Sequence, residues 1–365
     1  MKRVLFLTKF VPEGKPYGGM IRTTQLLEAL RSRFEVEVLG FSESGEPRPC
    51  SRLRSLGRSL ATGRPYQTVR YDTRWLRREI DERLETFQPD VIHVDYLHQA
   101  PIVWDRTIPL ALDLHNVESA LSAGIGASSK GFAGWLARRD ARLLEAVERR
   151  VTERYGLITV PSGKEATRMP GNVHVVVNGV HDRQPLDLLP DPNVVCFVGI
   201  FSWLPNIDGA EWLIEHVLPL LPERFRIQLV GRNPHRRVKD LAGPRVEVTG
   251  EVPDTWPYVC GAGVVAAPLL APGGTRHKIL EGALAGRPVV ATRAAADGLE
   301  DLAGQGIHLV DDPQGFADAI VALAGAPDVA AASGRMGREA VLRHYAWSAS
   351  KQKLLDLYAS ELGIA

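Results

Sequence analysis

The stretch from Ala271 to Arg293 constrains the fold more than any other part of the chain. It follows an apolar run, Val264–Leu270, that is typical of a buried parallel strand, and it contains a second such run at Pro288–Thr292. Between the two runs, a pair of glycines opens a helical pattern that ends at Gly286, a good helix C-cap. Strand, glycine turn, helix and strand in this order predict a βαβ unit and therefore an α/β fold with parallel strands.

The glycine pair of this unit, Gly273 and Gly274, allows backbone dihedrals that other residues avoid. Successive N–H groups and the start of the next helix can then converge on one anion. Arg276 and Lys278 follow in the first turns and would add positive charge beside a phosphate. Glu281 lies farther along the same helix, where a carboxylate can accept hydrogen bonds from sugar hydroxyls. Each residue alone is more often a turn former or a solvated side chain, but their combination predicts a site for a phosphate-bearing ligand.

Residues 273–292, G-G-T-R-H-K-I-L-E-G-A-L-A-G-R-P-V-V-A-T, closely resemble the donor-site segment of the retaining GT-B glycosyltransferases, which transfer sugars from nucleotide donors. Members of that family often carry two glutamates eight positions apart in this segment. Glu281 matches the second glutamate, whereas Gly273 occupies the position of the first, as in a branch with the pattern G-x-G-T-R-x-K-x-L-E. The resemblance implies that Glu281 holds the ribose and that Arg276 and Lys278 hold the diphosphate.

Length and composition agree with a two-domain globular protein. At 365 residues the chain exceeds the size at which one hydrophobic core keeps growing, and 45% hydrophobic residues suffice for two cores. The net charge of +1 argues against nucleic acid as the main partner. Three widely spaced cysteines are typical of reduced thiols. No stretch approaches the roughly 20 apolar residues of a membrane helix, and the N-terminal apolar run is too short for a signal peptide. We therefore expect a cytoplasmic protein.

The resemblance spans nearly the whole chain and implies a GT-B fold, in which two Rossmann-like doubly wound domains face each other across a cleft. The expected N-terminal, acceptor-binding domain covers residues 1–180, a linker covers 181–192, and the C-terminal, donor-binding domain covers 193–345. A final helix within 346–365 is expected to pack back on the N-terminal domain. Strands are predicted at Val4–Leu7, Glu35–Phe41, Pro89–Asp95, Ile108–Asn116, Leu157–Pro161, Asn193–Gly199 and Arg226–Val230. Val173–Val180 is expected to complete the first domain, and Val310–Asp312 to follow the final strand.

Polar residues end two of the strands predicted for the first domain. In doubly wound sheets, ligands gather at the carboxyl ends of the parallel strands. A single histidine is more often structural than catalytic, but histidines at the ends of two strands are harder to attribute to packing. The segment L-D-L-H-N-V-E at 112–118 resembles a family segment whose histidine points at the donor sugar, which implies a catalytic role for His115. Further candidates for contacts to the acceptor or sugar are His93, Asp95, Asn116 and Glu118, and Asp113 lies in the same cluster.

Other glycines and loops resemble parts of the family's donor site. Gly18 and Gly19 stand between the first strand and a helix predicted over Ile21–Leu30, like the family's phosphate-contacting glycine loop. Asn178 belongs to an N-G-V motif at the crossing to the second domain, and Val252 lies in a segment that lines the nucleobase pocket. The predicted donor-binding residues are Gly18, Gly19, Asn178, Gly199, Val252, Gly273, Gly274, Thr275, Arg276, Lys278 and Glu281. The predicted catalytic residues are His115, Arg276, Lys278 and Glu281, with no metal ligand.

The sequence departs from the family pattern after the first strand of the second domain. Family members carry an arginine and a lysine there that hold the diphosphate. Ile200 stands at the position of the arginine, and Asn206 or Asp208 at that of the lysine. Losing both cations would cost several kcal/mol, because charge-assisted hydrogen bonds contribute roughly 1.5–3 kcal/mol each. We therefore predict that Arg276 and Lys278 take over this role, helped by backbone N–H groups.

The segment Arg48–Arg83 is rich in arginine and poor in acids. A solvated, partly helical surface is the simplest interpretation. The alternative is a patch that binds an anionic acceptor or anionic lipid headgroups, since such clusters attract both. Peripheral membrane contact through this segment therefore stays open.

The resemblance implies an enzyme of glycan or glycoside biosynthesis. It would move a hexose-type sugar from a nucleotide-diphosphate donor to a hydroxyl acceptor with retention, without a metal or another cofactor, as a monomer or weak dimer. The acceptor would be a glycan, a lipid-linked molecule or a small molecule. Two alternatives keep the same fold: a nucleotide-sugar epimerase, and a catalytically inactive partner protein that binds a sugar nucleotide. Release of nucleotide diphosphate only in the presence of an acceptor would distinguish the transferase from both.

Overall fold

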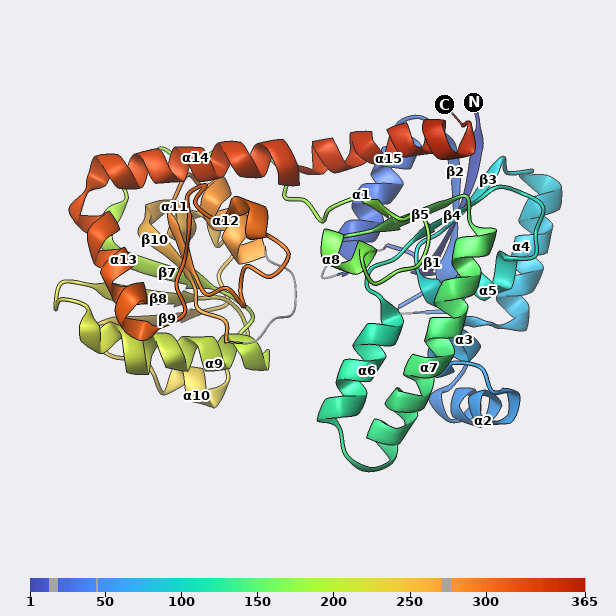
Figure 1. Cartoon of the computed structure of the whole chain (residues 1–365), viewed down its shortest axis with the longest axis horizontal. Coiled ribbons are helices and arrows are strands. Elements are labelled where there is room, and N and C mark those ends of the chain that lie inside the picture. Colours follow the sequence, from blue (N-terminus) through green and yellow to red (C-terminus); the bar gives the residue numbers. More distant parts are fainter. Residues whose placement is uncertain (13–18, 44, 271–276, 365) are drawn as a thin grey trace. The chain divides into compact units, whose positions relative to one another are not determined.

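The computed structural model describes residues 1–12, 19–43, 45–270 and 277–364, and the chain divides into two compact units (Figure 1). The first unit comprises Met1–Asn178 together with Ser350–Ala365, and the second comprises Gly179–Ala349. Each unit contains a parallel sheet with helices on both faces (Figure 1).

The sheet of the first unit has six described strands in the order β2-β1-β3-β4-β5-β6, and every neighbouring pair is parallel. The strands are β1 (Arg3–Phe10), β2 (Glu35–Phe41), β3 (Val91–Val94), β4 (Leu110–Asp113), β5 (Leu157–Val160) and β6 (His174–Val175). The helices are α1 (Gly19–Arg31), α2 (Arg52–Thr62), α3 (Tyr66–Tyr71), α4 (Arg74–Thr86), α5 (Ala100–Val103), α6 (Glu118–Ser128), α7 (Gly131–Arg154), α8 (Gly163–Ala166) and α15 (Trp347–Leu362), and a 3₁₀ turn spans Leu97–Gln99.

Alternation along β1 explains why helices cover both faces of this sheet. Successive side chains of a strand point to opposite faces. Val4 and Phe6 belong to a buried cluster with residues of α1 and with Tyr358 of α15. Leu5 and Leu7 belong to a second cluster, which contains residues of α4, α5 and α7. The C-terminal helix α15 therefore completes one of the two cores of the first unit.

The sheet of the second unit has six described strands in the order β12-β11-β10-β7-β8-β9, again with parallel neighbours. The strands are β7 (Asp191–Val198), β8 (Arg226–Val230), β9 (Val246–Gly250), β10 (Ala262–Ala267), β11 (Val289–Ala291) and β12 (Ile307–Leu309). The helices are α9 (Leu204–Trp212), α10 (Arg236–Lys239), α11 (Trp256–Gly261), α12 (His277–Leu284), α13 (Pro313–Gly325) and α14 (Pro327–Tyr345), and short π or 3₁₀ turns span Leu213–Val217, Leu218–Leu220 and Glu300–Leu302.

The end of α12 shows how the βαβ unit predicted from sequence is closed. Gly286 adopts a φ of 69°, in the left-handed region that favours glycine. Its N–H donates to the carbonyl of Ala283 (2.9 Å), and the N–H of Arg287 donates to that of Gly282 (3.1 Å). These two bonds are the Schellman arrangement, which satisfies the last carbonyls of a helix. The predicted C-cap is confirmed, and the chain turns directly into β11.

Two doubly wound parallel sheets confirm the predicted fold class. Val310–Asp312 directly follows the last described strand, β12 (Ile307–Leu309), as predicted. The two acidic residues that follow make side-chain bonds of their own. Asp311 accepts a hydrogen bond from the backbone N–H of Arg293 (2.8 Å), and Asp312 caps α13 by accepting from the N–H of Gly315 (2.8 Å).

Candidate functional site

Lys278 reaches the carboxyl end of β7 from the first turn of α12. Its ammonium group donates to Oδ1 of Asn206 in α9 (2.8 Å) and lies 5.4 Å from the centroid of the Phe197 ring. The Asn206 side chain is held in turn by donating to the carbonyl of Ile200 (3.0 Å). A Cβ on Gly199 would lie 2.8 Å from Nδ2 of Asn206, so only glycine lets the amide approach so closely. The structure therefore brings Gly199, Asn206 and Lys278 together.

Glu281 lies one turn after Lys278 on α12. Burial raises the pKa of its carboxyl group to about 7, although Lys278 and Arg183 oppose the shift. Arg183 is anchored by two bonds to the Asp254 carboxylate, of 2.5 and 3.1 Å, and lies over the Trp256 ring at 4.9 Å from its centroid. Glu281 is thus a largely desolvated acid with two cations in its electrostatic surroundings.

The raised pKa of Glu281 predicts how pH affects the stability of the second unit. The pKa of Glu281 in the folded state, about 7, exceeds the ordinary 4.5. The contribution of the Glu281 carboxyl group to the free energy of unfolding is therefore fully present below pH 4.5 and is lost as pH rises through 7. Glu281→Gln should remove this loss and raise the free energy of unfolding at pH 8 by about 1–3 kcal/mol. Urea denaturation at pH 5 and at pH 8 measures the effect. Glu339→Gln, at an exposed position on α14, is the control and should behave like the unmodified protein. An equal pH response in the Glu281 variant and the unmodified protein would contradict the prediction.

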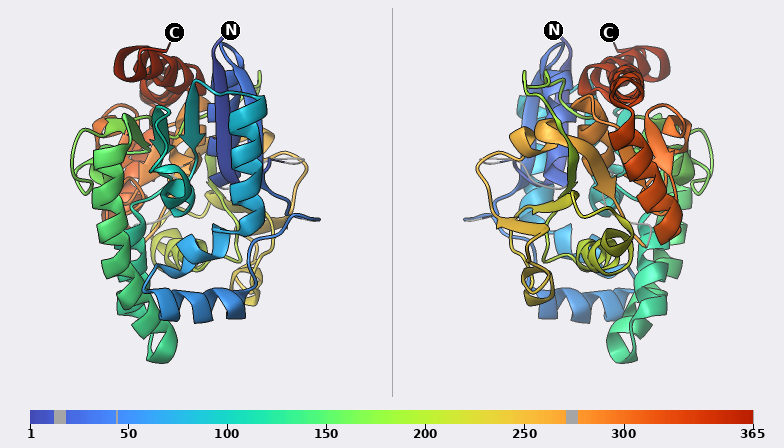
Figure 2. Two further views of the ribbon diagram at one scale, coloured as in Figure 1. Left: turned by 90° about the vertical axis from the view of Figure 1, so that its right-hand side faces the viewer. Right: turned by 90° about the vertical axis from the view of Figure 1, so that its left-hand side faces the viewer.

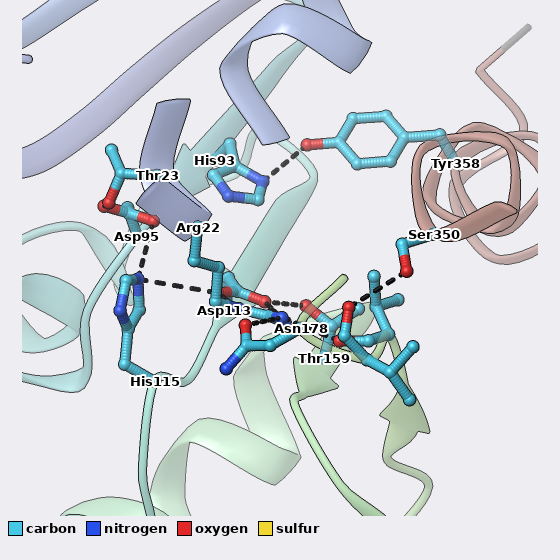
Figure 3. Close-up of polar contacts among 12 residues, drawn as sticks. Arg22, Thr23, His93, Asp95, Asp113, His115, Thr159, Asn178, Ser350 and Tyr358 are labelled. Carbon is cyan, nitrogen blue, oxygen red and sulfur yellow. Dashed lines mark hydrogen bonds and ion pairs between the residues drawn. The ribbon is translucent and has the colours of Figure 1, made fainter. Parts of the chain in front are cut away.

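In the first unit, acidic and imidazole side chains converge at the carboxyl ends of β3 and β4 (Figure 3). Nε2 of His115 lies 3.1 Å from Oδ1 of Asp95 and 3.7 Å from Oδ2 of Asp113. The His115 ring stacks on Tyr96 with ring centroids 4.0 Å apart. The structure therefore brings His115 and Asp95 together and fixes the orientation of the imidazole.

Arg22 of α1 neutralises the deepest acid of this cluster. Its guanidinium group donates to both oxygens of Asp113 (2.6 and 2.7 Å), to the carbonyl of Val176 (2.7 Å) and to Oδ1 of Asn178 (3.0 Å). Thr159 also donates to Asp113. Burial pushes the pKa of Asp113 upward, but the charge and hydrogen bonds of Arg22 outweigh it and hold the pKa below its ordinary value. Asp113 is therefore an ionised carboxylate, and both of its oxygens accept hydrogen bonds from Arg22.

Asp95, Asp113 and His115 together offer three ligand atoms within 4.8 Å of one another, a spacing that suits a metal ion. The bonds already made argue for a different role. Oδ2 of Asp95 accepts from the hydroxyls of Thr8 (2.8 Å) and Thr23 (2.7 Å), and both oxygens of Asp113 accept from Arg22. A cation bound here would lie beside a buried guanidinium and displace these donors. The residues fit an ion-pair network better than a metal site.

Matches to known families cover most of the chain. Residues 192–325 match the family described as "Glycosyl transferases group 1", and residues 18–179 match the "Glycosyl transferase 4-like domain". The chain matches glycosyltransferase domains in both of its units. It is therefore a glycosyltransferase of the GT-B fold, as predicted from its sequence. No curated protein sequence matches this glycosyltransferase significantly.

Solved structures with the same fold match this glycosyltransferase over its full length. Sucrose-phosphate synthase from Thermosynechococcus elongatus is 19% identical, with a TM-score of 0.68 and 100% of both chains covered. HepE from Anabaena, solved in complex with UDP-glucose, is 17% identical, with a TM-score of 0.67, 99% of this chain and 100% of that chain covered. A glycosyltransferase from Rickettsia africae is 13% identical, with a TM-score of 0.66, 100% of this chain and 99% of that chain covered. At these identities the likeness concerns the fold.

Several residues predicted for the donor site of this glycosyltransferase lie on other elements than Lys278 and Glu281. Asn178 belongs to the first unit, where its amide oxygen accepts from Arg22. Gly19 begins α1, and Val252 lies half-buried after β9, two residues before Asp254. The remaining predicted positions, Gly18, Gly273, Gly274, Thr275 and Arg276, lie outside the described residues.

His93 is a core residue rather than a member of the His115 network. Its ring is 1% exposed, stacks on Phe6 at a centroid distance of 4.7 Å, and Nδ1 lies 2.7 Å from the Tyr358 hydroxyl of α15 (Figure 3). Burial lowers the pKa of His93, so the imidazole is neutral at pH 7. Asn116 is exposed beside His115. The prediction that His93 contacts acceptor or sugar is therefore not supported by its position, because both faces of its ring lie within the core.

A second polar group of this glycosyltransferase contains Lys9, His98 and Glu118. Of these, only Glu118 was predicted as a site residue. The Lys9 ammonium lies 3.9 Å from the centroid of the Tyr96 ring, whose other neighbour is His115. Burial lowers the pKa of Lys9 and raises that of Glu118. Oε2 of Glu118 lies 3.5 Å from Nε2 of His98. Lys9 follows the first predicted strand. Because ligands gather at the carboxyl ends of parallel strands in doubly wound sheets, this position could have indicated Lys9 as a site residue. Arg22, in a helix with apolar spacing, offered no such signal.

The arginine-rich segment of this glycosyltransferase contains α2, α3 and the start of α4. Some of its arginines are paired within the protein, as Arg64 and Arg77 are with the buried Asp72 (2.8 and 2.6 Å). In the described part of the chain, no single helix is long and apolar enough to cross a membrane. Helices α13 and α14 meet that length-and-composition test only when taken together across a 107° bend.

Proposed function

We propose that this glycosyltransferase transfers a hexose from a nucleotide-diphosphate donor to a hydroxyl acceptor with retention of anomeric configuration and without a metal ion. The observation that carries the proposal is the position of Lys278, whose ammonium group contacts Asn206. In the family pattern a lysine stands at the position of Asn206 or Asp208 in α9. The ammonium group of Lys278, which reaches Asn206 from α12, supports the proposal that it takes the role of this lysine.

In this proposal the second unit binds the donor. Lys278 pairs with the diphosphate, and Arg276 adds a second cation from the preceding segment. Glu281 accepts hydrogen bonds from the ribose hydroxyls. Its carboxyl group, with a pKa of about 7, titrates near neutral pH, and hydroxyl donors would favour its ionised form. UDP-glucose is the first donor to test, because HepE from Anabaena was solved in complex with it.

The first unit would bind the acceptor and present His115 to the donor sugar. Asp95 accepts from Nε2 of His115 in one tautomer, which leaves Nδ1 as the acceptor of the ring. Asp95 and Asp113 are poor candidates for a covalent nucleophile, because Thr8, Thr23 and Arg22 already occupy their oxygens. We therefore favour a route in which the departing diphosphate takes the acceptor proton on the same face. Lys278 would stabilise the charge that develops on the leaving group.

Donor turnover with and without an acceptor tests this function. UDP-glucose and other sugar nucleotides are incubated with a panel of glycans, lipid-linked and small-molecule hydroxyl acceptors, and nucleotide diphosphate and product are measured by mass spectrometry. We expect nucleotide diphosphate only when an acceptor is present, an axial anomeric bond retained in the product by NMR, and unchanged rates in EDTA. Sugar conversion without release would indicate an epimerase, and binding without turnover an inactive partner. An inverted product would contradict retention, and EDTA inhibition reversed by Mn²⁺ would contradict metal independence.

A further inference from the structure

Helix α2 buries its polar side and exposes its leucines. Ser55 and Ser59, one turn apart, are 0% exposed, whereas Leu53 and Leu60 are 84% and 45% exposed. Residues four apart share one side of a helix, and residues seven apart share another. An amphipathic helix of a soluble protein normally turns its apolar side to the core. The apolar side of α2 instead faces outward.

Hydrogen bonds explain why the serine side is the inner one. The Ser59 hydroxyl donates to the carbonyl of Arg64 (2.7 Å). Arg139 of α7 donates to the carbonyl and the hydroxyl oxygen of Ser59 (2.7 and 3.1 Å). Tyr66 follows α2, and its N–H donates to the neighbouring Asp140 (2.8 Å). Polar contacts with α7 therefore fix the rotation of α2, so that Leu53 and Leu60 face outward.

A second group of exposed apolar side chains lies at the tip of the hairpin formed by α6 and α7. Phe132 and Trp135 of α7 are 57% and 46% exposed, and their rings stack with centroids 5.5 Å apart. Leu121 and Ile125 of α6 are each 47% exposed. Trp135 precedes Arg139, the residue that contacts α2, by one helical turn. Figures 1 and 2 show α2 and the hairpin tip at the same end of the first unit, away from the N-terminus.

The charge of this end of the first unit is strongly positive. Pro47–Arg78 contains nine arginines and one acid, Asp72, which is buried and paired. Ser119–Asp140 contains three cations and one acid, Asp140, which pairs with Arg139. Arg52 and Arg54 flank Leu53, both are exposed, and neither forms an ion pair within the described residues. Arginines beside leucines and aromatic rings are typical of a helix that lies in the interface of a bilayer with anionic lipids.

We propose that α2 and the tip of the α6–α7 hairpin bind the surface of an anionic lipid bilayer. Leu53, Leu60, Phe132 and Trp135 enter the headgroup boundary, while Arg52 and Arg54 pair with lipid phosphates. This role goes beyond sugar transfer and does not depend on the donor or the reaction. It would hold the first unit at a membrane, where hydroxyl acceptors carried on lipids are concentrated.

Sedimentation of the full chain with lipid vesicles tests the proposal. Vesicles of three parts phosphatidylcholine to one part phosphatidylglycerol are compared with phosphatidylcholine alone, at low and high salt. We expect binding to the anionic vesicles that weakens with salt. The double variant Arg52→Glu/Arg54→Glu should lower the partition constant at least about twentyfold, since each basic residue contributes roughly fivefold. Leu53→Ser/Leu60→Ser and Phe132→Ser/Trp135→Ser should each lower it at least about tenfold.

Matched variants in the second unit control for general effects of charge and hydrophobicity. Arg236→Glu and Leu189→Ser change side chains that are 90% and 97% exposed and should leave the partition constant unchanged. Circular dichroism and thermal melts establish that every variant is folded. Three results would overturn the proposal: no binding to anionic vesicles, equal binding to neutral vesicles, or folded surface variants that bind like the unmodified protein. Light scattering that shows a dimer abolished by the leucine variants, without vesicle binding, would instead make a second copy the occupant.

Discussion

Lys278→Ala should lower kcat/KM for sugar transfer by at least about tenfold, which corresponds to about 1.4 kcal/mol of transition-state stabilisation. The reason is electrostatic, because the variant removes an ammonium group from the carboxyl end of β7, where the diphosphate is proposed to bind. Glu281→Ala should lower kcat/KM by a similar factor by removing the ribose contact. Steady-state rates of nucleotide diphosphate release measure both. Lys239→Ala, at an exposed position on α10, is the control and should leave the rate unchanged. Unmodified rates in both site variants would place the donor elsewhere.

A relocated cation offers a sharper test of the same site. Asn206 or Asp208 stands where family members carry a lysine, and Oδ1 of Asn206 contacts the Lys278 ammonium at 2.8 Å. In the Lys278→Ala background, Asn206→Lys should therefore recover part of the lost kcat/KM, because it returns a positive charge to nearly the same place. Asn206→Gln in that background supplies no charge and is the matched control. Equal rates in the two double variants would show that a cation at this place does not assist the reaction.

Local patterns in the sequence predicted the architecture well. The apolar run, the glycines and the Gly286 cap predicted β10, α12 and β11, because each signal lies within a few residues of the structure it determines. Long-range partners were not predictable in this way. Arg22 and Asp113 are 91 positions apart, and an arginine within an amphipathic helix ordinarily indicates a solvated face.

The orientation of helix α2 is a second feature that local sequence patterns did not predict. Apolar spacing in a helix predicts that the leucines face the core, yet the hydrogen bonds of Ser59 with Arg139 turn them outward. Those hydrogen bonds connect residues 80 positions apart, so no local sequence pattern predicts them. The proposed contact between Lys278 and the donor was predicted from a local pattern, the basic residues that follow the glycine pair, and from the two cations that the family pattern carries and this chain lacks. Arg22 and the serines of α2, whose positions depend on distant partners, are therefore residues that the sequence left unassigned.

Arg22→Met should destabilise the first unit by about 3–5 kcal/mol, because it leaves the carboxylate of Asp113 buried without its counter-ion. Asp113 is 0% exposed, and in the unmodified protein Arg22 holds its pKa low, so that this contribution to stability is present at neutral pH and is lost as pH falls. In the variant the direction reverses, and the destabilisation should shrink at low pH as Asp113 takes up a proton. Urea denaturation followed at pH 5 and pH 8 measures both effects.

Two further variants decide whether the buried charge is the cause of this destabilisation. Arg22→Met/Asp113→Asn removes the charge together with its partner, so it should be more stable than Arg22→Met alone and should lose most of the pH dependence. Arg237→Met breaks an exposed pair with Asp208 and Glu211 and should have little effect, because water screens such pairs. If Arg22→Met were no more destabilising than Arg237→Met, Asp113 would not depend on Arg22. The orientation of His115 by Asp95 and Asp113 would then not depend on Arg22.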